Sequence, residues 1–178
     1  MRIVSGVKKG KRIIAPKNLP TRPTTDFAKE SLFNILNNRF HFDGLNVLDL
    51  FTGTGNISYE FASRGAGLIT SVDNNYGCTK FIEKTADDLG FDQIIAVKHD
   101  AFKWLKMDNK KYDIIFCDPP YELLGIEEIP NLVFEKNLLA QEGLLIVEHG
   151  RDTRFEEHPQ FNELKKYSSV NFSFFKEG

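Results

Sequence analysis

Asp49-Leu50-Phe51-Thr52-Gly53-Thr54-Gly55 decides the fold, because an apolar segment ends in it and a glycine turn follows at once. The pattern predicts a buried strand over 46–50 and a helix over 57–63. In a doubly wound α/β sheet, ligands bind at the carboxyl ends of the strands, where this turn lies. Glycine suits such a turn because a side chain would hold a ligand away from the backbone. The turn alone is compatible with NAD, FAD, S-adenosylmethionine or no ligand.

Two details of the loop favour S-adenosylmethionine over a dinucleotide. Ser58 stands where the dinucleotide-binding pattern has its third glycine. Asp49, ahead of the glycines, suits a cationic ligand better than a pyrophosphate. S-adenosylmethionine has an ammonium group and a sulfonium group and carries no phosphate. The loop therefore favours S-adenosylmethionine as the ligand.

Acidic residues after the next two predicted strands extend the cofactor site. Asp73 ends a strand predicted over 68–73 and can accept both ribose hydroxyls, a feature shared with NAD proteins. Asp100 follows a strand predicted over 94–97 and can accept from the adenine amino group, while the Ala101 N–H donates to the ring. Asp100 can equally be a helix N-cap, and the two roles are compatible. The predicted cofactor site is completed by neighbouring residues: Phe51, Asn74 and Asp118.

The rest of the chain alternates between strand and helix patterns. Apolar runs predict further strands at 112–117 and 143–148, and helical patterns fall at 76–89, 101–105 and 126–139. Continuously apolar strands separated by helices are typical of a parallel sheet covered on both faces. We therefore expect an α/β fold, a Rossmann-like and mostly parallel sheet with helices on both faces.

The two ends of the chain add to this sheet. Segments 2–5 and 11–15 predict an N-terminal β-hairpin, and a helix begins near Thr25 or Asp26, either of which can be its N-cap. Segments 165–170 and 171–175 predict a closing pair of strands. We expect one domain over 1–178, with 1–39 as a basic extension and 40–178 as the catalytic core.

The net charge of −2 conceals an asymmetry. Residues 1–39 have a net charge of +7, and the remaining residues have −9. A basic arm on an acidic body indicates contact with a polyanion, although composition alone is equally compatible with a solvated hairpin. Four residues of the arm are predicted to bind phosphates: Lys8, Lys9, Lys11 and Arg12.

A second motif, Asp118-Pro119-Pro120-Tyr121, follows the strand predicted over 112–117. Consecutive prolines lock the backbone and remove N–H donors, which leaves carbonyl oxygens, a carboxylate and an aromatic face. If Asp118 and the Pro119 carbonyl accept hydrogen bonds from the N–H groups of a nucleobase amino nitrogen, the nitrogen can become pyramidal. Its lone pair can then attack the methyl group of a sulfonium. Tyr121 would stack on the base. A structural Pro-Pro loop is the alternative, and the order of the two motifs disfavours it.

Other classes of site are not indicated. Cys78 and Cys117 have no CxxC spacing and no His cluster beside them, so we expect reduced, buried thiols and no metal. No apolar run approaches the ~20 residues needed to cross a bilayer, and the N-terminus has no apolar segment typical of a signal peptide. We expect a cytoplasmic protein without a membrane partner.

With these motifs in place, nearly the whole chain resembles the small-subunit (16S) ribosomal RNA guanine-N(2)-methyltransferases of the RsmD type. The resemblance includes the opening stretch 2–6, the basic stretch 9–12, the block Arg22-Pro23-Thr24-Thr25-Asp26, and both motifs above. It implies a seven-stranded methyltransferase sheet with an antiparallel C-terminal strand pair. It also implies methylation of a guanine amino group in small-subunit RNA, on an assembling ribosomal particle.

The resemblance adds three residues beside the cofactor and the substrate pocket: Arg22, Thr24 and Asp26. Arg22 is also expected to contact RNA. Phe27 departs from the pattern, since the family usually has arginine there. The alternatives are an amino-methyltransferase acting on DNA, at adenine N6 or cytosine N4, or on a protein glutamine. A DNA enzyme usually adds a target-recognition region, and a glutamine enzyme more often has Asn in place of Asp118.

Overall fold

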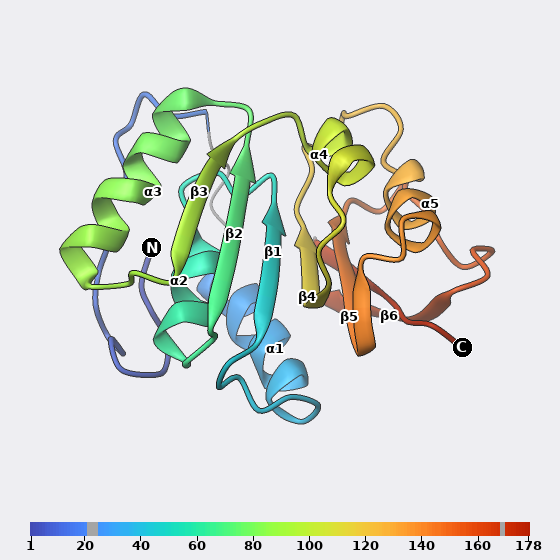
Figure 1. Cartoon of the computed structure of the whole chain (residues 1–178), viewed down its shortest axis with the longest axis horizontal. Coiled ribbons are helices and arrows are strands. Elements are labelled where there is room, and N and C mark those ends of the chain that lie inside the picture. The colour runs from blue at the N-terminus through green and yellow to red at the C-terminus, as the bar shows by residue number, and fades with distance from the viewer. Residues whose placement is uncertain (21–24, 168–169) are drawn as a thin grey trace.

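A computed structural model describes residues 1–20, 25–167 and 170–178 of the chain. Its centre is a seven-stranded sheet in the order β3-β2-β1-β4-β5-β7-β6 (Figure 1). The first five strands are mutually parallel, and β7 pairs antiparallel with both β5 and β6. The strands are β1 (Asn46–Leu50), β2 (Leu68–Asp73), β3 (Ile94–Lys98), β4 (Tyr112–Cys117), β5 (Leu139–His149), β6 (Phe161–Tyr167) and β7 (Val170–Phe175). The predicted sheet and its antiparallel C-terminal pair are confirmed.

Helices cover both faces of the sheet, as predicted. They are α1 (Asp26–Asn37), α2 (Asn56–Ser63), α3 (Tyr76–Leu89), α4 (Ala101–Met107) and α5 (Glu128–Glu135). One core joins α1, α2 and α3 to the sheet, and a second joins α4 and α5 to its other face. Successive residues of β4 belong to different cores, since Ile114 packs into the first and Ile115 into the second. This explains why the strand is continuously apolar.

Helix termini follow the local signals in the sequence. Of the two N-cap candidates for α1, Thr25 is the cap, and its Oγ1 accepts from the Ala28 N–H at 3.2 Å. The helix predicted over 76–89 is confirmed as α3. It ends at Gly90, whose φ of 70° is the left-handed conformation that glycine adopts without strain.

Several predicted boundaries were wrong, among them the start of the strand predicted over 143–148, which begins at Leu139. The helix predicted over 126–139 is shorter, because the chain turns at Asn137, with φ of 52°, and β5 already begins at Leu139. The apolar residues at the end of that pattern belong to the turn and the strand. The strand predicted over 165–170 begins earlier, as β6 at Phe161. Its first half contains two polar residues, Asn162 and Glu163, as an edge strand can, so the apolar signal there is weak.

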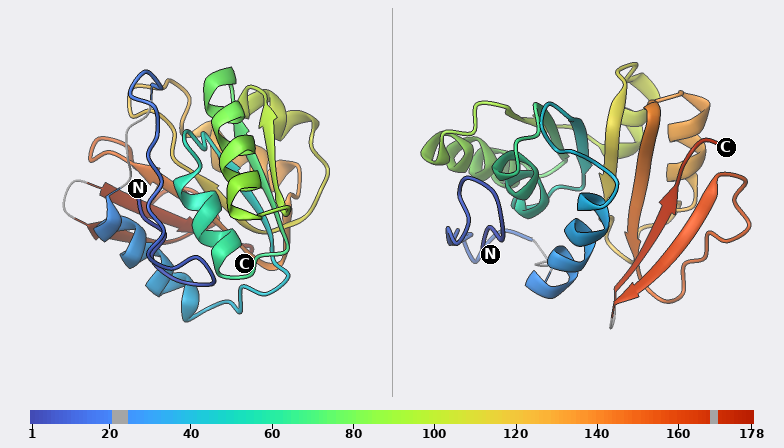
Figure 2. Two further views of the ribbon diagram at one scale, coloured as in Figure 1. Left: turned by 90° about the vertical axis from the view of Figure 1, so that its left-hand side faces the viewer. Right: turned by 90° about the horizontal axis from the view of Figure 1, so that it is seen from below.

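The N-terminal arm folds back on itself and packs against α2. Its hairpin contains one antiparallel bridge, between Arg2 and Arg12, and no extended strand pair. The Glu60 carboxylate accepts from the backbone N–H groups of Val4 and Ser5, at 2.8 and 3.0 Å. The left panel of Figure 2 shows the arm, in dark blue, on the side of the molecule that carries α1 and α2.

Candidate active site

A pocket of about 580 Å³ opens at the carboxyl edge of the sheet. The strand order reverses between β1 and β4, and the pocket is built from the segments that follow β1, β2, β3 and β4. This is the usual ligand site of an open α/β sheet, and the volume suits a small-molecule ligand. Ten predicted site residues line it: Asp49, Phe51, Gly53, Asp73, Asn74, Asp100, Ala101, Asp118, Pro119 and Tyr121.

The glycine loop after β1 adopts an unusual backbone. Phe51 has φ of 58°, which is a strained conformation for a bulky residue and is typical of functional sites. Its ring lines the pocket and meets Phe102 edge to face, with 6.2 Å between centroids. Gly55 does not line the pocket. A Cβ there would lie 2.8 Å from the Tyr59 ring, so Gly55 is required for packing as well as for its φ of 83°.

Asp49 lies beneath this loop and is almost completely buried. Its Oδ2 accepts from the Thr52 hydroxyl at 2.8 Å and from the Ser58 hydroxyl at 2.5 Å. Burial raises the pKa of Asp49 from its ordinary value to about 6, while the hydrogen bonds from Ser58 and Thr52 oppose the rise. Ser58, at the position of the missing third glycine, therefore helps to hold a negative charge in the pocket.

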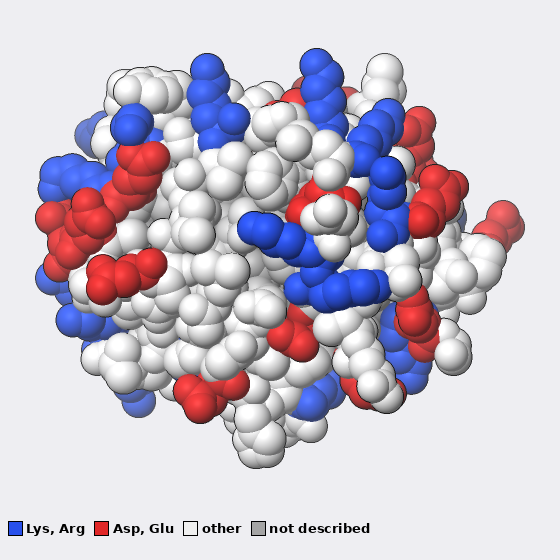
Figure 3. Space-filling model, in the orientation of Figure 1, with Lys and Arg blue, Asp and Glu red and all other residues white. Residues whose placement is uncertain are grey.

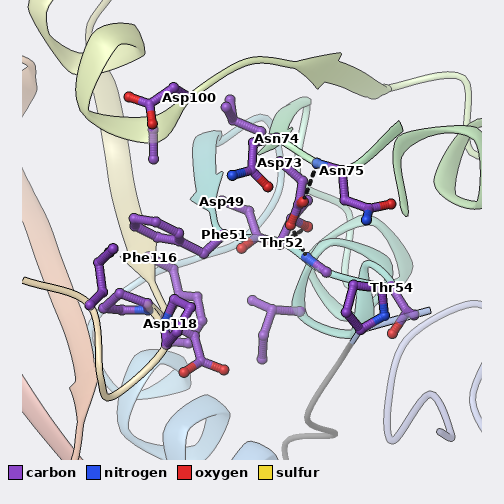
Figure 4. A pocket seen from close by; sticks show the side chains of 18 of the residues that line it. Asp49, Phe51, Thr52, Thr54, Asp73, Asn74, Asn75, Asp100, Phe116 and Asp118 are labelled. Carbon is purple, nitrogen blue, oxygen red and sulfur yellow. Dashed lines mark hydrogen bonds between the residues drawn. The ribbon is translucent and has the colours of Figure 1, made fainter. Parts of the chain in front are cut away.

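Asp73 connects the end of β2 to the glycine loop. One carboxylate oxygen accepts from the Gly53 N–H at 2.9 Å, and the other accepts from the Asn75 N–H at 2.8 Å (Figure 4). A carboxylate has about four acceptor positions, so these two bonds leave capacity for ribose hydroxyls. Asp100 caps α4 by accepting from the Lys103 N–H at 2.8 Å, and it also lines the pocket. The cap role of Asp100 is thus compatible with a ligand contact.

The Asp-Pro-Pro-Tyr turn lies on the other side of Phe51 from Asp100 in Figure 4. It begins where the Asp118 N–H donates to the Leu50 carbonyl oxygen, at 3.4 Å, so the turn is attached to β1. The Tyr121 ring packs over Gly150, where a Cβ would lie 3.1 Å from a ring carbon. Gly150 follows β5 and was not predicted as a site residue. A larger residue there would push the tyrosine ring aside.

Other residues of the pocket were also missed. Met1 and Pro20 come from the N-terminal arm, and no sequence pattern links them to a turn that follows about 50 and about 30 residues later, respectively. His99, to which the sequence assigned no role, lines the pocket and meets Trp104 edge to face. Phe102 was detectable in principle, since it follows Asp100 and Ala101 on the first turn of a helix.

Some predicted site residues lie elsewhere. Asp26 does not line the pocket and instead forms an ion pair with Arg2, at 3.3 Å. Arg22 and Thr24 lie outside the described residues. The four basic residues of the arm, Lys8, Lys9, Lys11 and Arg12, are exposed and lie outside the pocket.

A buried ion pair between Lys29 of α1 and Glu60 of α2 connects the arm to the helix that follows the glycine loop. The Lys29 side chain is completely buried, 3.4 Å from the Glu60 carboxylate and 2.8 Å from the Asn56 side-chain oxygen. Burial lowers the pKa of Lys29, while the Glu60 carboxylate opposes that change. Asn56 begins α2 directly after Gly55 and lines the pocket. The arm therefore has a polar connection to the wall of the pocket.

Charges of both signs are mixed on the face shown in Figure 3. Over α3, at the left of this view, Lys80 pairs with Glu83 and Lys84 with Asp88, each at 2.6 Å. Such neutralised pairs do not attract a polyanion. The sequence of the arm is different, because Lys8, Lys9, Lys11 and Arg12 follow one another without an intervening acid.

The cysteines, the acidic and histidine side chains and the helices bear on other kinds of site. Cys78 and Cys117 are free and buried, as predicted. Across residues 1–20, 25–167 and 170–178, no group of three or more His, Cys, Asp or Glu side chains is arranged to hold a metal ion. Within the same ranges, none of the helices is long and apolar enough to span a membrane.

Comparison with known proteins agrees with this geometry. The chain is 33% identical to the ribosomal RNA small subunit methyltransferase D of Buchnera aphidicola, over 83% of this chain and 75% of that protein. A Thermus thermophilus protein shares its fold, with a TM-score of 0.85 and 21% identity over 99% of both chains. So does a 16S rRNA N2 G1207 methyltransferase of T. thermophilus, solved with AdoMet and guanosine, with a TM-score of 0.71. That likeness has 19% identity over 90% of this chain and 45% of the other.

The family model described as Conserved hypothetical protein 95 matches residues 1–176, almost the whole chain. Together with the relative above and the motifs in the pocket, this match confirms the predicted RsmD-type membership and S-adenosylmethionine as the cofactor. The chain belongs to the Conserved hypothetical protein 95 family of S-adenosylmethionine-dependent methyltransferases.

Proposed function

We propose that this protein methylates the exocyclic N2 amino group of a guanine in small-subunit ribosomal RNA. One observation carries the proposal: Asp118-Pro119-Pro120-Tyr121 and the glycine loop line the same pocket. Methylation of ribosomal RNA is the activity named for its relatives. The choice of guanine N2 rests on the sequence resemblance and on the chemistry of the turn.

The residues of the pocket fit the cofactor. When bound, S-adenosylmethionine supplies a methyl group made electrophilic by the sulfonium. The buried carboxylate of Asp49 is suited to its ammonium group, since an ionised acceptor in a low-dielectric site attracts a cation strongly. Asp73 has acceptor capacity for ribose hydroxyls, and Asp100 with Ala101 flanks the space for adenine. Phe51 provides an aromatic surface between these two ends.

The turn after β4 can activate a weak nucleophile. An amino nitrogen on a nucleobase is unreactive because its lone pair is delocalised into the ring. Asp118 and the Pro119 carbonyl accept hydrogen bonds from its two N–H groups, so the nitrogen becomes pyramidal and its lone pair points at the methyl group. Positive charge develops on the nitrogen as the bond between sulfur and the methyl group breaks, and the same acceptors stabilise that charge. The methylated nitrogen then loses one proton and is neutral again. Tyr121, supported by Gly150, stacks on the base and fixes its plane.

The basic arm then has a defined role. Lys8, Lys9, Lys11 and Arg12 contact phosphates of the RNA, while hydrogen bonds to Glu60 keep the arm fixed to α2. An assembling small ribosomal particle is the partner that we infer for this surface. Methylation of DNA or of a protein glutamine by the same turn remains the alternative that the first experiment separates.

Transfer of labelled methyl groups tests the proposal directly. Small ribosomal particles from cells that lack this protein are incubated with it and labelled S-adenosylmethionine, digested with nuclease, and analysed as nucleosides. We expect label in N(2)-methylguanosine at one position. Label in another nucleoside would contradict the guanine N2 assignment. Label only in DNA or protein acceptors offered in parallel would contradict the RNA substrate.

A further inference from the structure

An exposed aromatic side chain lies on the first turn of α1. The Phe27 side chain is 63% exposed, which is unusual because burial of phenylalanine normally stabilises a fold. Its ring meets that of Tyr167 edge to face, with 6.2 Å between centroids and 78° between planes. Tyr167 ends β6 and packs partly against the core on the α1 side of the sheet. The second ring therefore holds the first in place on the surface.

The register of the sheet places this pair at the pocket edge. Asn171 of β7 pairs with His149 at the end of β5, and Tyr167 pairs with Val170 at the start of β7. Because β7 is antiparallel to both β5 and β6, the end of β6 lies at the same edge of the sheet as the carboxyl ends of β4 and β5. Three strand spacings separate β6 from β4, or about 14 Å. Tyr167 is thus within a few nucleotides' reach of the Asp118 turn.

The direction of α1 agrees with this placement. Arg39, just beyond the helix, forms an ion pair with Glu163 near the start of β6. Phe27, at the other end of the helix, contacts Tyr167 at the end of β6. The helix therefore runs back along β6, and its first turn lies at the carboxyl edge. In Figure 2, α1 lies beside the C-terminal strands, drawn in red.

Contacts between the pocket and the aromatic pair are continuous. Tyr121 packs over Gly150, and the Gly150 carbonyl oxygen accepts from the Asn171 side chain at 3.1 Å. Asn171 is the neighbour of Val170, which pairs with Tyr167. A strand of RNA that leaves the pocket over Tyr121 can follow this edge of the sheet to Phe27.

Arg2 reduces the negative charge around Phe27. Asp26 and Glu30 flank it on α1, but Arg2 forms ion pairs with both, at 3.3 and 3.4 Å. Arg2 therefore offsets one of the two negative charges next to the aromatic ring, and a single negative charge remains among these three groups.

We propose that Phe27, supported by Tyr167, stacks an unpaired base of the RNA substrate a few nucleotides from the target guanine. The inference rests on the proposed function and names the form of RNA bound: a single-stranded or splayed-out segment, not a continuous duplex. Unstacked bases are what aromatic side chains bind in RNA, and such stacking tolerates every base. Stacking on Phe27 is a second contact beside that of the target guanine, and it fixes the direction in which the RNA strand leaves the pocket.

Tryptophan at position 27 gives a direct readout. The Phe27→Trp variant keeps an aromatic face, and its added fluorescence, measured against the parent protein, should be quenched by a single-stranded RNA oligonucleotide of mixed sequence. A duplex of the same sequence should quench it much less. A purely structural role for Phe27 would produce neither effect. Fluorescence that changes with protein concentration and not with RNA would show a self-association surface and overturn the proposal.

Binding and turnover provide the second test. Phe27→Ala and Phe27→Leu should each raise KM for small ribosomal particles about tenfold, while kcat and cofactor affinity stay near those of the parent. Phe27→Trp should retain the parent KM. Met107→Ala removes an exposed apolar side chain from α4 and serves as the matched control.

The two failures are distinguishable. If the parent protein methylates RNA and Phe27→Ala has an unchanged KM, the stacking site is wrong and the proposed function stands. If the parent methylates no RNA but the Phe27→Trp signal responds to single-stranded RNA, the proposed reaction is wrong and the binding site stands. If neither occurs, both are wrong.

Discussion

Two acidic turns face the same pocket, and they are held in place by different means. Asp49 is buried beneath a loop that is kept in shape by side-chain hydrogen bonds from Thr52 and Ser58. Asp118 begins a turn whose backbone is restricted by two prolines, and it is less deeply buried. The loop after β1 is thus held in shape by side-chain hydrogen bonds, and the turn after β4 is held by the rings of its two prolines.

This difference matches the two tasks that we assign. A cofactor with a fixed positive charge is best bound by a buried, pre-ionised acceptor, because reorganisation is not needed when it arrives. The target nucleobase must enter and leave the pocket, and a rigid turn at the mouth of the pocket is better suited to bind it. We therefore expect the loop to control cofactor affinity and the turn to control turnover, and the following changes test that separation.

The largest effect should come from Asp118→Ala. Loss of one acceptor of the developing charge should lower kcat about 10²- to 10³-fold. The dissociation constant for S-adenosylmethionine, measured by calorimetry, should stay near the parent value because the loop is untouched. Glu127→Ala, an exposed acid before α5, is the matched control. Near-normal turnover in Asp118→Ala would rule out the proposed mechanism.

Lys29→Met tests the attachment of the arm and α1 to α2, the helix that follows the glycine loop. The substitution removes one member of a fully buried ion pair and leaves the Asn56 side chain without that donor. We expect the free energy of unfolding, from urea denaturation, to fall by about 3 kcal/mol. Lys84→Met breaks an exposed pair on α3 and should cost no more than about 0.5 kcal/mol. Equal losses for both would contradict the structural role of Lys29.

Replacing Lys8, Lys9, Lys11 and Arg12 together by alanine tests the basic arm. The plot of log binding constant against log salt for single-stranded RNA should become less steep, by up to about 3 in slope, because four phosphate contacts are lost. Cofactor affinity should hardly change, since these side chains lie outside the pocket. Loss of Lys80 and Lys84 on α3 is the control. A slope equal to that of the parent would exclude the arm from RNA binding.

Ser58→Ala should have the smallest effect, a change in pH dependence. The pKa of Asp49 is raised to about 6, so its carboxylate is neutralised and cofactor affinity should fall as the pH drops through that value. Removing the Ser58 hydroxyl takes away a hydrogen bond that favours the ionised form, so the midpoint should move upward by about one pH unit. Thr54→Ala removes a loop hydroxyl that does not contact Asp49 and should leave the midpoint unchanged.

Many of the pocket residues at the carboxyl edge of the sheet were predictable, because the sequence patterns that place them are local. A strand, its turn and the following cap are set by residues next to one another, so Asp49, Asp73, Asp100 and Asp118 were placed correctly at the carboxyl edge. Errors arose where a local pattern was ambiguous. The buried residues at 138–139 continue a helical pattern, yet they belong to a turn and to β5.

Contacts between distant segments were not predictable in this way. Asp26 was expected at the pocket, but Arg2 lies close enough to pair with it. Met1 lines the pocket because hydrogen bonds to Glu60 bring the arm back onto α2. Gly150 lies beneath Tyr121 only because β5 pairs with β4. None of these neighbours leaves a periodic signal in one sequence.

The sequence alone determined the class of fold, the order of the two motifs and the kind of cofactor, because strand patterning and turn chemistry act over a few residues. Tertiary structure decided which charges are buried, which are neutralised and which aromatic rings remain on the surface. Those properties depend on neighbours that lie far apart along the chain. Lys29 and Phe27, two residues apart on one helix, illustrate the difference: one is completely buried in an ion pair, and the other is 63% exposed.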